Sequence, residues 1–298
     1  MTTENTLLSH SALSTTAPLT VTRFAPSPTG LLHLGHAYSA LFAEAAATDK
    51  GGRFLLRLED IDVGRCRPEF EAAIFEDLQW LGLHWETPVR RQSDHLDDHA
   101  AALAHLDDAG LLYPCFCTRK DLAREAAMSL SAPHSPDGPI YPGTCRNLDK
   151  TTREERITSG APHALRLDTA KAMRTIGRPL TFTDSARGRI DVQPEDCGDV
   201  VLARKDIATS YHLAVVVDDA RQGVTLITRG EDLLHATPVH RILQTLLGYS
   251  EPLYHHHALL HGPDGARYAK RDGAVTLAAL RDKGATPEDI RQMIQDHA

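Results

Sequence analysis

The stretch Arg23-Phe-Ala-Pro-Ser-Pro-Thr-Gly-Leu-Leu-His-Leu-Gly-His36 decides how this chain is expected to fold. Residues 19–23, before and at its start, alternate in a way that predicts a β-strand. After it, apolar side chains recur at helical spacing through Ala37–Ala47. The apolar run Arg53–Glu59 then predicts a second strand, parallel to the first. The pattern is therefore that of a strand–turn–helix–strand unit of an α/β fold.

The turn of this unit has the composition of a phosphate-binding site. Its notable residues are Pro26, Pro28, Gly30, His33, Gly35 and His36. The glycines let a ligand approach the backbone closely, and the prolines stiffen the approach. A helix N-terminus adds free N–H groups and a partial positive charge, which suit phosphate. On its own, a short His-Leu-Gly-His segment would be read as an ordinary turn with exposed histidines.

The complete string, however, resembles the HIGH signature of class I aminoacyl-tRNA synthetases, in the form found in the glutamyl enzymes. The segment Leu78-Gln-Trp-Leu-Gly-Leu-His-Trp85 resembles the same family. The resemblance implies an α/β fold with a Rossmann-type parallel sheet, an inserted zinc-containing module and a short helical C-terminal region. It also implies a ligase that forms an aminoacyl-adenylate from ATP.

We expect five regions along the chain. Cysteines and loop-like residues begin at Tyr113, and an α/β pattern returns near residue 200, with a buried strand expected at Leu213–Val217 and another at Val224–Thr228. The expected divisions are a disordered tail (1–18), the first half of the Rossmann domain (19–112), the inserted zinc module, resembling an acceptor-binding module (113–199), the second half (200–247), and a KMSKS-like loop with helices resembling a stem-contact region (248–298).

Composition sets broad limits on function. The formal net charge is −8, which argues against general adhesion to nucleic acid but permits a local basic face, and basic residues are in excess between Arg146 and Lys205. No apolar run approaches membrane-spanning length. The Ser/Thr-rich start lacks the basic and apolar parts of a signal peptide. We therefore expect a cytoplasmic protein without a membrane partner.

The expected glutamate pocket draws on several separate segments. Glu59 ends the second strand, where open α/β sheets place their ligands, and its carboxylate could pair with a substrate ammonium. Arginine side chains such as that of Arg229 can bind a carboxylate with two hydrogen bonds. We expect Tyr211 and Arg229 each to lie in a segment made of a strand followed by a loop, both at this same edge of the sheet. Taken singly, these residues would be read as packing or surface residues. The family resemblance assigns glutamate binding to Arg23, Ala25, Ser27, Glu59, Tyr211 and Arg229.

The resemblance also assigns the ATP site, which would use Mg²⁺ with the nucleotide. Tyr268-Ala-Lys-Arg271 occupies the place of the KMSKS loop, although Arg267 and Ala269 depart from its usual residues. The implied catalytic residues are His33, His36 and Lys270. The implied ATP contacts are Pro26, Gly30, His33, Gly35, His36 and Lys270.

The cysteines predict a metal site. Cys115, Cys117 and Cys145, with Tyr141, could place three thiolates and a phenolate around Zn²⁺, although spacing alone leaves ordinary thiols equally open. The set resembles the structural zinc site of glutamyl-Q tRNA(Asp) synthetases. By contrast, the three consecutive histidines at 255–257 cannot readily converge on a metal from a strand, so we interpret them, with His261, as structural or surface residues.

The motifs up to the Lys270 loop resemble two families, the glutamyl-tRNA synthetases and their short paralogues, the glutamyl-Q tRNA(Asp) synthetases. Few residues follow the Lys270 loop, which favours the paralogue. Its activity would be activation of L-glutamate with ATP, without tRNA, and transfer to queuosine in the anticodon stem-loop of tRNA(Asp), by a monomer. The alternatives are a truncated glutamyl-tRNA synthetase that charges a tRNA 3′ end and a catalytically silent RNA-binding relative.

Overall fold

The computed structural model describes residues 19–118, 120–121, 134–135, 138–261 and 275–297. The predicted N-terminal tail and the loop around Lys270 lie outside these residues. Within them the strands are β1 (Val21–Phe24), β2 (Arg53–Leu58), β3 (Arg90–Arg91), β4 (Leu112–Cys115), β5 (His134–Ser135), β6 (Gly138–Pro139), β7 (Ala164–Leu167), β8 (Thr181–Asp184), β9 (Gly188–Asp191), β10 (Val201–Ala203), β11 (Leu226–Gly230) and β12 (Leu253–His257).

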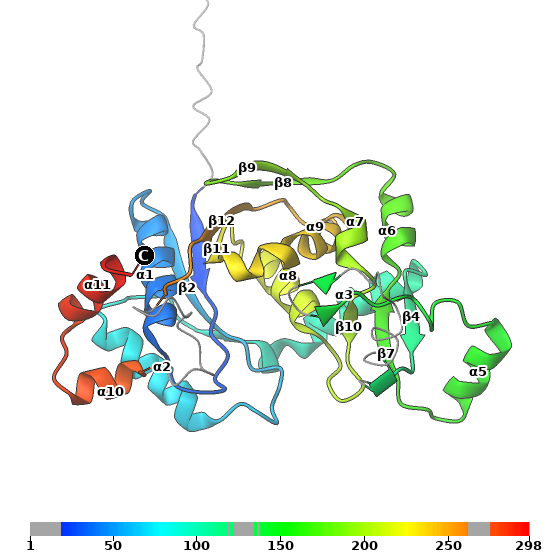
Figure 1. Ribbon diagram of the computed structural model, residues 1–298, viewed down its shortest axis with the longest axis horizontal. Helices are drawn as coiled ribbons and strands as arrows, with labels where there is room; N and C mark the ends of the chain where they lie inside the picture. The colour runs from blue at the N-terminus through cyan, green and yellow to red at the C-terminus, as the bar shows by residue number, and fades with distance from the viewer. Residues whose placement is uncertain (1–18, 119, 122–133, 136–137, 262–274, 298) are drawn as a thin grey trace, which may run out of the picture.

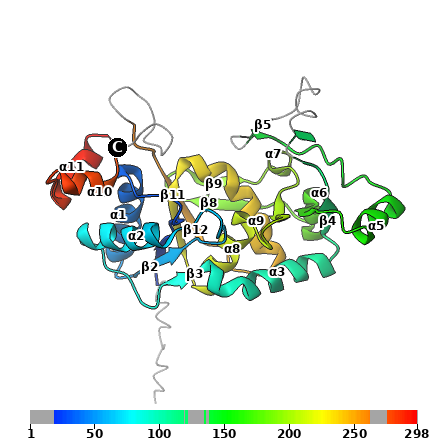
Figure 2. The same ribbon diagram turned by 90° about the horizontal axis from the view of Figure 1, so that it is seen from below.

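The helices of the described residues cover the sheet and extend to both ends of the molecule. They are α1 (Leu34–Thr48), α2 (Pro68–Trp80), α3 (Leu96–Asp108), α5 (Lys150–Thr158), α6 (Thr169–Ile176), α7 (Pro194–Cys197), α8 (Tyr211–Arg221), α9 (Thr237–Leu246), α10 (Leu277–Asp282) and α11 (Pro287–Gln295), with 3₁₀ turns η1 (Gln92–His95) and η2 (Glu231–Ala236). Helices α10 and α11 lie at one end and α5 at the other (Figures 1 and 2).

The main sheet is built from two halves that come from distant parts of the chain. Strands β1, β2 and β3 pair in parallel, and so do β11 and β12. The halves meet at β1, where the Thr225 amide donates to the Val21 carbonyl at 3.0 Å. Helix α1 packs across β1, β2 and β11. The predicted parallel α/β architecture is confirmed.

Strand β2 is buried on both faces, which explains its continuous apolar sequence. Phe54 and Leu56 belong to the cluster around α1 and α2, whereas Leu55 belongs to the cluster around α8 and α9. Side chains alternate along a strand, so Arg57 lies on the face of Leu55 and is completely buried. A charged side chain in this position needs a partner inside the protein.

The inserted region contributes to two different sheets. Strands β4, β7 and β10 form a separate antiparallel sheet. Strands β8 and β9 instead extend the main sheet, since Tyr254 of β12 pairs with Asp184 of β8. The range 113–199, predicted as one module, therefore includes strands that extend the main sheet.

The expectation of a strand at Leu213–Val217 is wrong. These residues belong to helix α8, and every residue from Leu213 to Asp219 is buried. Helix α8 packs against α3 and α9, so this stretch has no polar face and its sequence shows no helical period. Tyr211 consequently begins a helix, and Arg229 lies inside β11 rather than in a loop after it.

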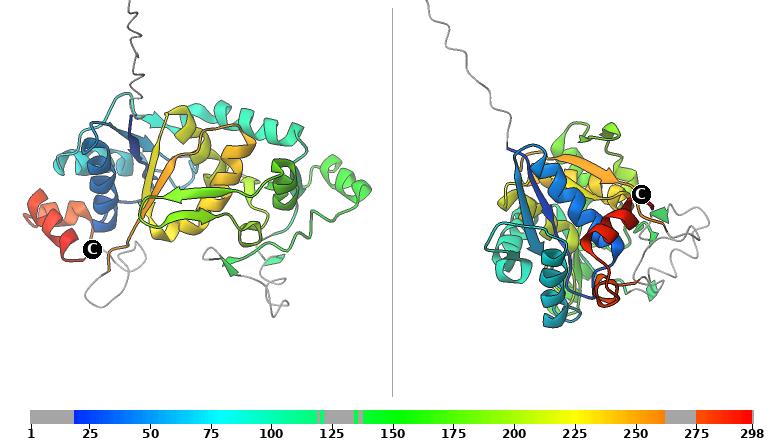
Figure 3. Two further views of the ribbon diagram at one scale, coloured as in Figure 1. Left: turned by 90° about the horizontal axis from the view of Figure 1, so that it is seen from above. Right: turned by 90° about the vertical axis from the view of Figure 1, so that its left-hand side faces the viewer.

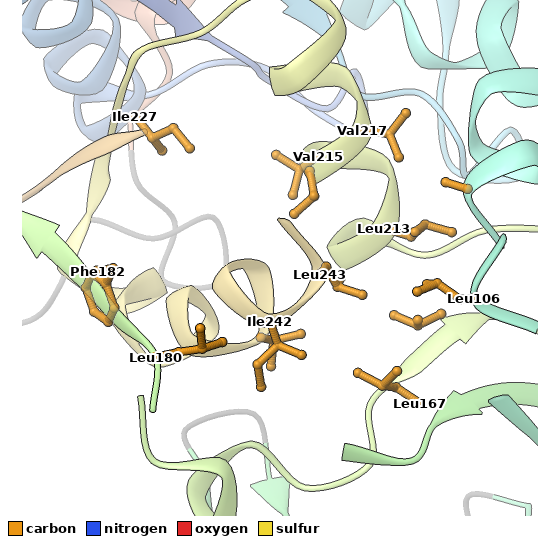
Figure 4. Packing of buried hydrophobic residues seen from close by; sticks show 14 of the residues in the cluster. Leu106, Leu167, Leu180, Phe182, Leu213, Val215, Val217, Ile227, Ile242 and Leu243 are labelled. Atoms are coloured by element: carbon orange, nitrogen blue, oxygen red, sulfur yellow. The ribbon is translucent and has the colours of Figure 1, made fainter. Parts of the chain in front are cut away.

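The core that holds α8 is formed by side chains from many elements. Figure 4 shows Leu213, Val215 and Val217 of α8 near Ile242 and Leu243 of α9, with Phe182 of β8 and Ile227 of β11 in the same cluster. Leu106 of α3 and Leu167 of β7 extend the cluster toward the inserted sheet. Both halves of the Rossmann fold and the insertion therefore share one core.

The expected helical C-terminal region is present, and its helices α10 and α11 dock beside α2 and α1 (Figure 3). Thr286 caps α11 with Asp289 in a capping box, with Pro287 in the first turn. Arg281 of α10 donates to the buried Asp77 of α2 at 2.8 Å. In the described residues, no helix combines the length and apolar character needed to cross a membrane.

Buried Asp218 makes a pH-dependent contribution to this fold. Its carboxylate accepts hydrogen bonds from Arg90 and Gln92, each at 2.8 Å, and contacts His99 at 3.3 Å. Burial alone would raise its pKa, but the hydrogen bond from His99 and the guanidinium groups of Arg57 and Arg90 lower the pKa to about 2.

We predict that Asp218→Asn lowers the free energy of unfolding at pH 7 by about 2 kcal/mol or more. The ionised carboxylate stabilises the native state fully above its unfolded pKa of 3.8, and this benefit is lost as the pH falls toward 2. Urea unfolding of both proteins should therefore give a constant difference above about pH 5 that narrows below pH 4. A difference that stays constant to pH 3 would contradict an ionised Asp218.

Candidate active site

The signature turn orders itself by capping its own helix. His33 is the N-cap of α1, and its Nδ1 accepts a hydrogen bond from the Gly35 amide at 3.1 Å. The Nδ1 of His36 in turn accepts from the His33 amide at 3.2 Å. Because both Nδ1 atoms accept, the neutral imidazoles carry their protons on Nε2. The two rings lie together, with centroids 3.8 Å apart, at the positive end of the helix.

A cavity of about 550 Å³ opens beside this turn. Pockets of this size accommodate small ligands and cofactors. Its wall is formed by β1, the start of α1, the end of β2, the start of α8, β11 and the segment after β12. The lining residues are Arg23, Phe24, Ala25, Ser27, His33, Gly35, His36, Tyr38, Ser39, Glu59, Tyr211, Thr228, Arg229, Gly230, Asp232, Leu233, His257, Ala258, Leu259 and Leu260.

Most of the predicted site residues are thus brought together. The nine in the wall are Arg23, Ala25, Ser27, His33, Gly35, His36, Glu59, Tyr211 and Arg229. Pro26 and Gly30 do not line the cavity, although the Pro26 carbonyl accepts from the Glu59 amide at 3.0 Å and so fixes the two segments together. Lys270 lies outside the described residues, and its role stays a prediction.

Beneath the cavity floor, Asp219 joins two buried arginines. Its Oδ1 accepts from Arg23 Nε at 2.9 Å and from Arg57 Nη1 at 2.7 Å. Arg57 also contacts Glu59, with Nη2 at 3.2 Å from Oε1. Burial alone would raise the pKa of Asp219, but the two guanidinium groups lower it. Burial raises the pKa of Glu59 despite the opposing effect of Arg57 and Arg23.

Arg229 is held differently, by uncharged groups. Its Nε donates to His256 Nε2 at 3.2 Å, and its Nη2 donates to the Thr237 hydroxyl at 2.6 Å. Its Nη1 lies 3.1 Å from His240 Nδ1 and 3.4 Å from the Tyr211 hydroxyl. Arg229 itself is 6% exposed. A buried guanidinium in such surroundings is suited to an anionic ligand.

Sequence reasoning missed most of the residues that support this pocket. Asp219 and Arg57 are far apart in sequence, and no local pattern pairs them. Of the histidines interpreted as structural or surface residues, His256 and His257 are buried, and His256 accepts a hydrogen bond from Arg229, a contact that the sequence does not reveal. The strand alternation does separate them as expected, since His255 and His257 contact Phe42 while His256 stacks on Tyr254. The sequence did contain one signal for buried ion pairs, namely charged residues such as Arg57 and Asp219 inside or next to apolar runs.

The predicted basic face is also smaller than its sequence suggests. Arg166 is buried over the Tyr141 ring, and Arg146 pairs with Asp199. Arg153 donates to backbone carbonyls, and Arg187 pairs with Glu231. The exposed members of the expected set include Arg156, Arg174, Arg178 and Arg189.

A second cluster, formed by Cys115, Cys117 and Cys145, could hold a metal ion. Its sulfur atoms all lie within 4.8 Å of one another. The Tyr141 hydroxyl is 3.5 Å from Cys115 Sγ and 3.6 Å from Cys117 Sγ, and Cys117 lies 3.5 Å from Cys145. Sulfur ligands of a tetrahedral ion with bonds of about 2.3 Å are separated by about 3.8 Å. The donor set and its spacing therefore fit such an ion.

The surroundings of the cluster favour an anionic Cys145, whereas burial raises the pKa of Cys117 to about 12 and also raises the pKa of Tyr141. The Phe116 amide donates to Cys145 Sγ at 3.4 Å, and the Cys145 amide donates to the Tyr141 hydroxyl at 2.8 Å. The Arg166 guanidinium lies 3.9 Å from the centre of the Tyr141 ring. Burial alone would raise the pKa of Cys145, but hydrogen bonds from Tyr141 and Phe116 lower it.

Comparison with known proteins agrees with this fold. The family model for the catalytic domain of class I tRNA synthetases of the E and Q type matches residues 20–296. The crystal structure of a glutamate tRNA ligase from Elizabethkingia meningosepticum, in complex with its amino acid, superposes with a TM-score of 0.76 at 28% identity. That match covers 93% of this chain and 60% of the other. The protein is therefore a synthetase-type ligase of class I.

Closer relatives narrow the family. The glutamyl-Q tRNA(Asp) synthetase of Rhodobacter capsulatus is 49% identical over 279 residues, which cover 92% of this chain and 99% of the relative. The glutamate–tRNA ligase of Aquifex aeolicus is 38% identical, and the match covers 90% of this chain but only 55% of that protein. Within class I, this chain belongs to the glutamyl-Q tRNA(Asp) synthetase family.

Proposed function

We propose that this protein activates L-glutamate with ATP, without tRNA, and transfers it to queuosine at position 34 of tRNA(Asp). The observation that carries the first half is Arg229, a buried guanidinium held by uncharged partners and facing the same cavity as Glu59. The second half rests on relatives such as the Rhodobacter capsulatus protein, whose name states that acceptor.

Glutamate recognition follows from the charges around the cavity. Glu59 would pair with the substrate ammonium, while Arg229 and Arg23 would bind its carboxylates, with Tyr211, Ala25 and Ser27 completing the wall. Arg23 already shares Asp219 with Arg57, so its remaining donors are oriented before substrate arrives. Glutamine should bind less well, because its amide is uncharged and offers the guanidinium one accepting oxygen, while its NH₂ group turns a donor toward a second donor.

The reaction is adenylyl transfer. An oxygen of the glutamate α-carboxylate attacks the α-phosphorus of ATP, and the bond from that phosphorus to the pyrophosphate oxygen breaks. The N-terminus of α1, with His33 and His36 protonated on Nε2, would position and stabilise the phosphate charge. Mg²⁺ bound with ATP would neutralise the departing pyrophosphate. Gly35 would allow the nucleotide to approach the backbone closely, Pro26 and Gly30 would shape the turn outside the cavity wall, and Lys270 would contact the triphosphate.

The second step is acyl transfer to a hydroxyl. The cyclopentene diol of queuosine offers an oxygen that could attack the adenylate carbonyl, form an ester and release AMP, as a terminal ribose does in ordinary charging. The exposed arginines of the insertion, among them Arg156, Arg174 and Arg189, would contact phosphates of the anticodon stem-loop. Similarity to the Aquifex aeolicus enzyme supports one alternative acceptor, the 3′ end of a tRNA.

The first test is glutamate-dependent exchange of pyrophosphate into ATP in the absence of RNA. All the glutamate contacts proposed above come from the catalytic fold itself, so exchange should proceed without tRNA and glutamine should support it poorly. Arg229→Ala should lower kcat/KM for glutamate by about 30- to 1000-fold, equivalent to roughly 2–4 kcal/mol.

Arg221→Ala is the matched control for this variant, because Arg221 makes an exposed ion pair with Asp98 and lies away from the cavity. It should leave exchange almost unchanged. Exchange that appears only after addition of tRNA would contradict the proposed RNA-independent activation and would favour the alternative.

The second test identifies the acceptor. tRNA(Asp) that carries queuosine should accept glutamate, whereas the same tRNA with unmodified guanosine should not. An isolated anticodon stem-loop with queuosine should also be charged, because no contact with the acceptor end is required. Mapping the attached glutamate to the 3′-terminal adenosine would rule out the proposed acceptor.

For the cysteine cluster, we propose one structural Zn²⁺ per chain, bound by Cys115, Cys117, Tyr141 and Cys145. The four donors are a closed set, which is typical of structural rather than catalytic zinc. The carbonyls of Phe116 and Cys117 accept from Lys205 Nζ at 3.1 Å, which would connect the metal-binding turn to the segment before α8.

Elemental analysis of protein purified without chelator should therefore find about one zinc per chain. Cys145→Ala should lose most of the metal and lower the unfolding temperature, whereas Cys66→Ala, at a cysteine outside the cluster, should do neither. Tyr141→Phe removes only the oxygen donor, and we expect it to weaken retention against a chelator. Unchanged zinc content in Cys115→Ala and Cys145→Ala would place the metal elsewhere.

A further inference from the structure

Arg229 differs from the other buried arginines of the site in its partners. Arg23 and Arg57 both bind the carboxylate of Asp219. In the described part of the chain, Arg229 forms no ion pair with any carboxylate, and its hydrogen bonds go to imidazoles and hydroxyls, those of His256, His240, Thr237 and Tyr211. Among the described residues, its buried positive charge thus has no carboxylate as counter-ion.

The geometry fixes the protonation of the two histidines. A guanidinium only donates hydrogen bonds, so His256 must present a lone pair at Nε2 and His240 one at Nδ1. The other nitrogen of each ring then carries the proton. His256 Nδ1 lies 2.7 Å from Asp184 Oδ2, which accepts that proton's hydrogen bond, and His240 Nε2 lies 3.1 Å from His212 Nδ1. Asp184 therefore determines the tautomer of His256.

Electrostatics agree with this assignment. Burial and the nearby Arg229 charge lower the pKa of His256 to about 4. Burial and the same charge hold the pKa of His240 well below its usual value. Both imidazoles are consequently neutral at physiological pH and can accept from Arg229. Asp184 is compensated on its far side, where the amides of Ala186 and Arg187 donate to Oδ1 at 2.9 and 3.0 Å.

We propose that His256, His240 and Thr237 are positioning residues that make the pocket selective for a negatively charged substrate side chain. They hold Arg229 firmly in place but leave its charge to be neutralised by the ligand. Asp184 contributes by keeping His256 in the accepting tautomer. This inference rests on the proposed activation of glutamate. It attributes the preference of the pocket for glutamate over uncharged analogues to residues that carry no charge themselves.

The proposal predicts that the charge of these partners matters more than their shape. A carboxylate at position 256 or 240 would form an ion pair with Arg229 and compete with the substrate carboxylate for the same guanidinium. An amide at either position could still accept from Arg229 through its oxygen and would leave the charge uncompensated. Amide and acid side chains are nearly identical in size, so they form matched pairs.

The experiment compares His256→Gln with His256→Glu, and His240→Asn with His240→Asp, by pyrophosphate exchange with glutamate and with glutamine. Each amide variant should stay within about tenfold of the wild type in KM for glutamate. Each acid variant should raise that KM about 100-fold or more, change the KM for ATP little, and reduce the preference for glutamate over glutamine. Asp184→Asn, which permits the other His256 tautomer, should fall between them.

Thermal unfolding of every variant separates loss of the fold from loss of selectivity, and the two pairs provide independent tests if one acid variant does not fold. Equal losses in the amide and acid variants, or an unchanged glutamate preference in the acid variants, would overturn the inference. A wild-type protein that catalyses no glutamate-dependent exchange would instead refute the proposed function. The two failures are therefore distinguishable.

Discussion

The structure depends on one buried carboxylate, that of Asp219, which is shared by two arginines of the sheet. Asp219 of α8 binds Arg23 of β1 and Arg57 of β2. A single buried carboxylate thus connects a helix of the second half of the fold to two strands of the first half. Buried charges are costly unless they are paired, which makes this arrangement sensitive to the loss of any member. It also leaves Arg23 oriented at the cavity wall and Glu59 beside Arg57. Substrate recognition and folding therefore use the same ion pairs.

Much of this architecture was predictable from local sequence. Pro68 in the first turn of α2 and Thr286 at the N-cap of α11 are helix-start signals that can be read from the sequence. The run before Glu59 is the parallel strand that was expected, and it is buried. The Cys-x-Cys pair and the later Tyr-x₃-Cys segment also converge, which the spacing alone left open and the family resemblance implied. The helix starts and the strand were predictable because their physical cause lies within a few residues.

The errors and omissions have a common origin in long-range packing. The run Leu213–Val217 reads as a strand because α8 is buried on all sides, which removes the polar face that reveals a helix. The roles of Asp219 and His256 depend on arginines that only the tertiary fold brings near them. The number of arginines in the insertion likewise suggested a larger basic surface than the structure has, because residues such as Arg166 are buried.

The central claim is that the buried guanidinium of Arg229, which lines the pocket, takes the substrate as its counter-ion. A crystal structure of the protein with L-glutamate bound tests it most directly. The account predicts a glutamate carboxylate within about 3 Å of the Arg229 guanidinium, with the substrate ammonium beside Glu59 and with Arg23 and Arg57 still bound to Asp219. A glutamate bound away from Arg229, or a protein carboxylate paired with Arg229 in its place, would contradict the account.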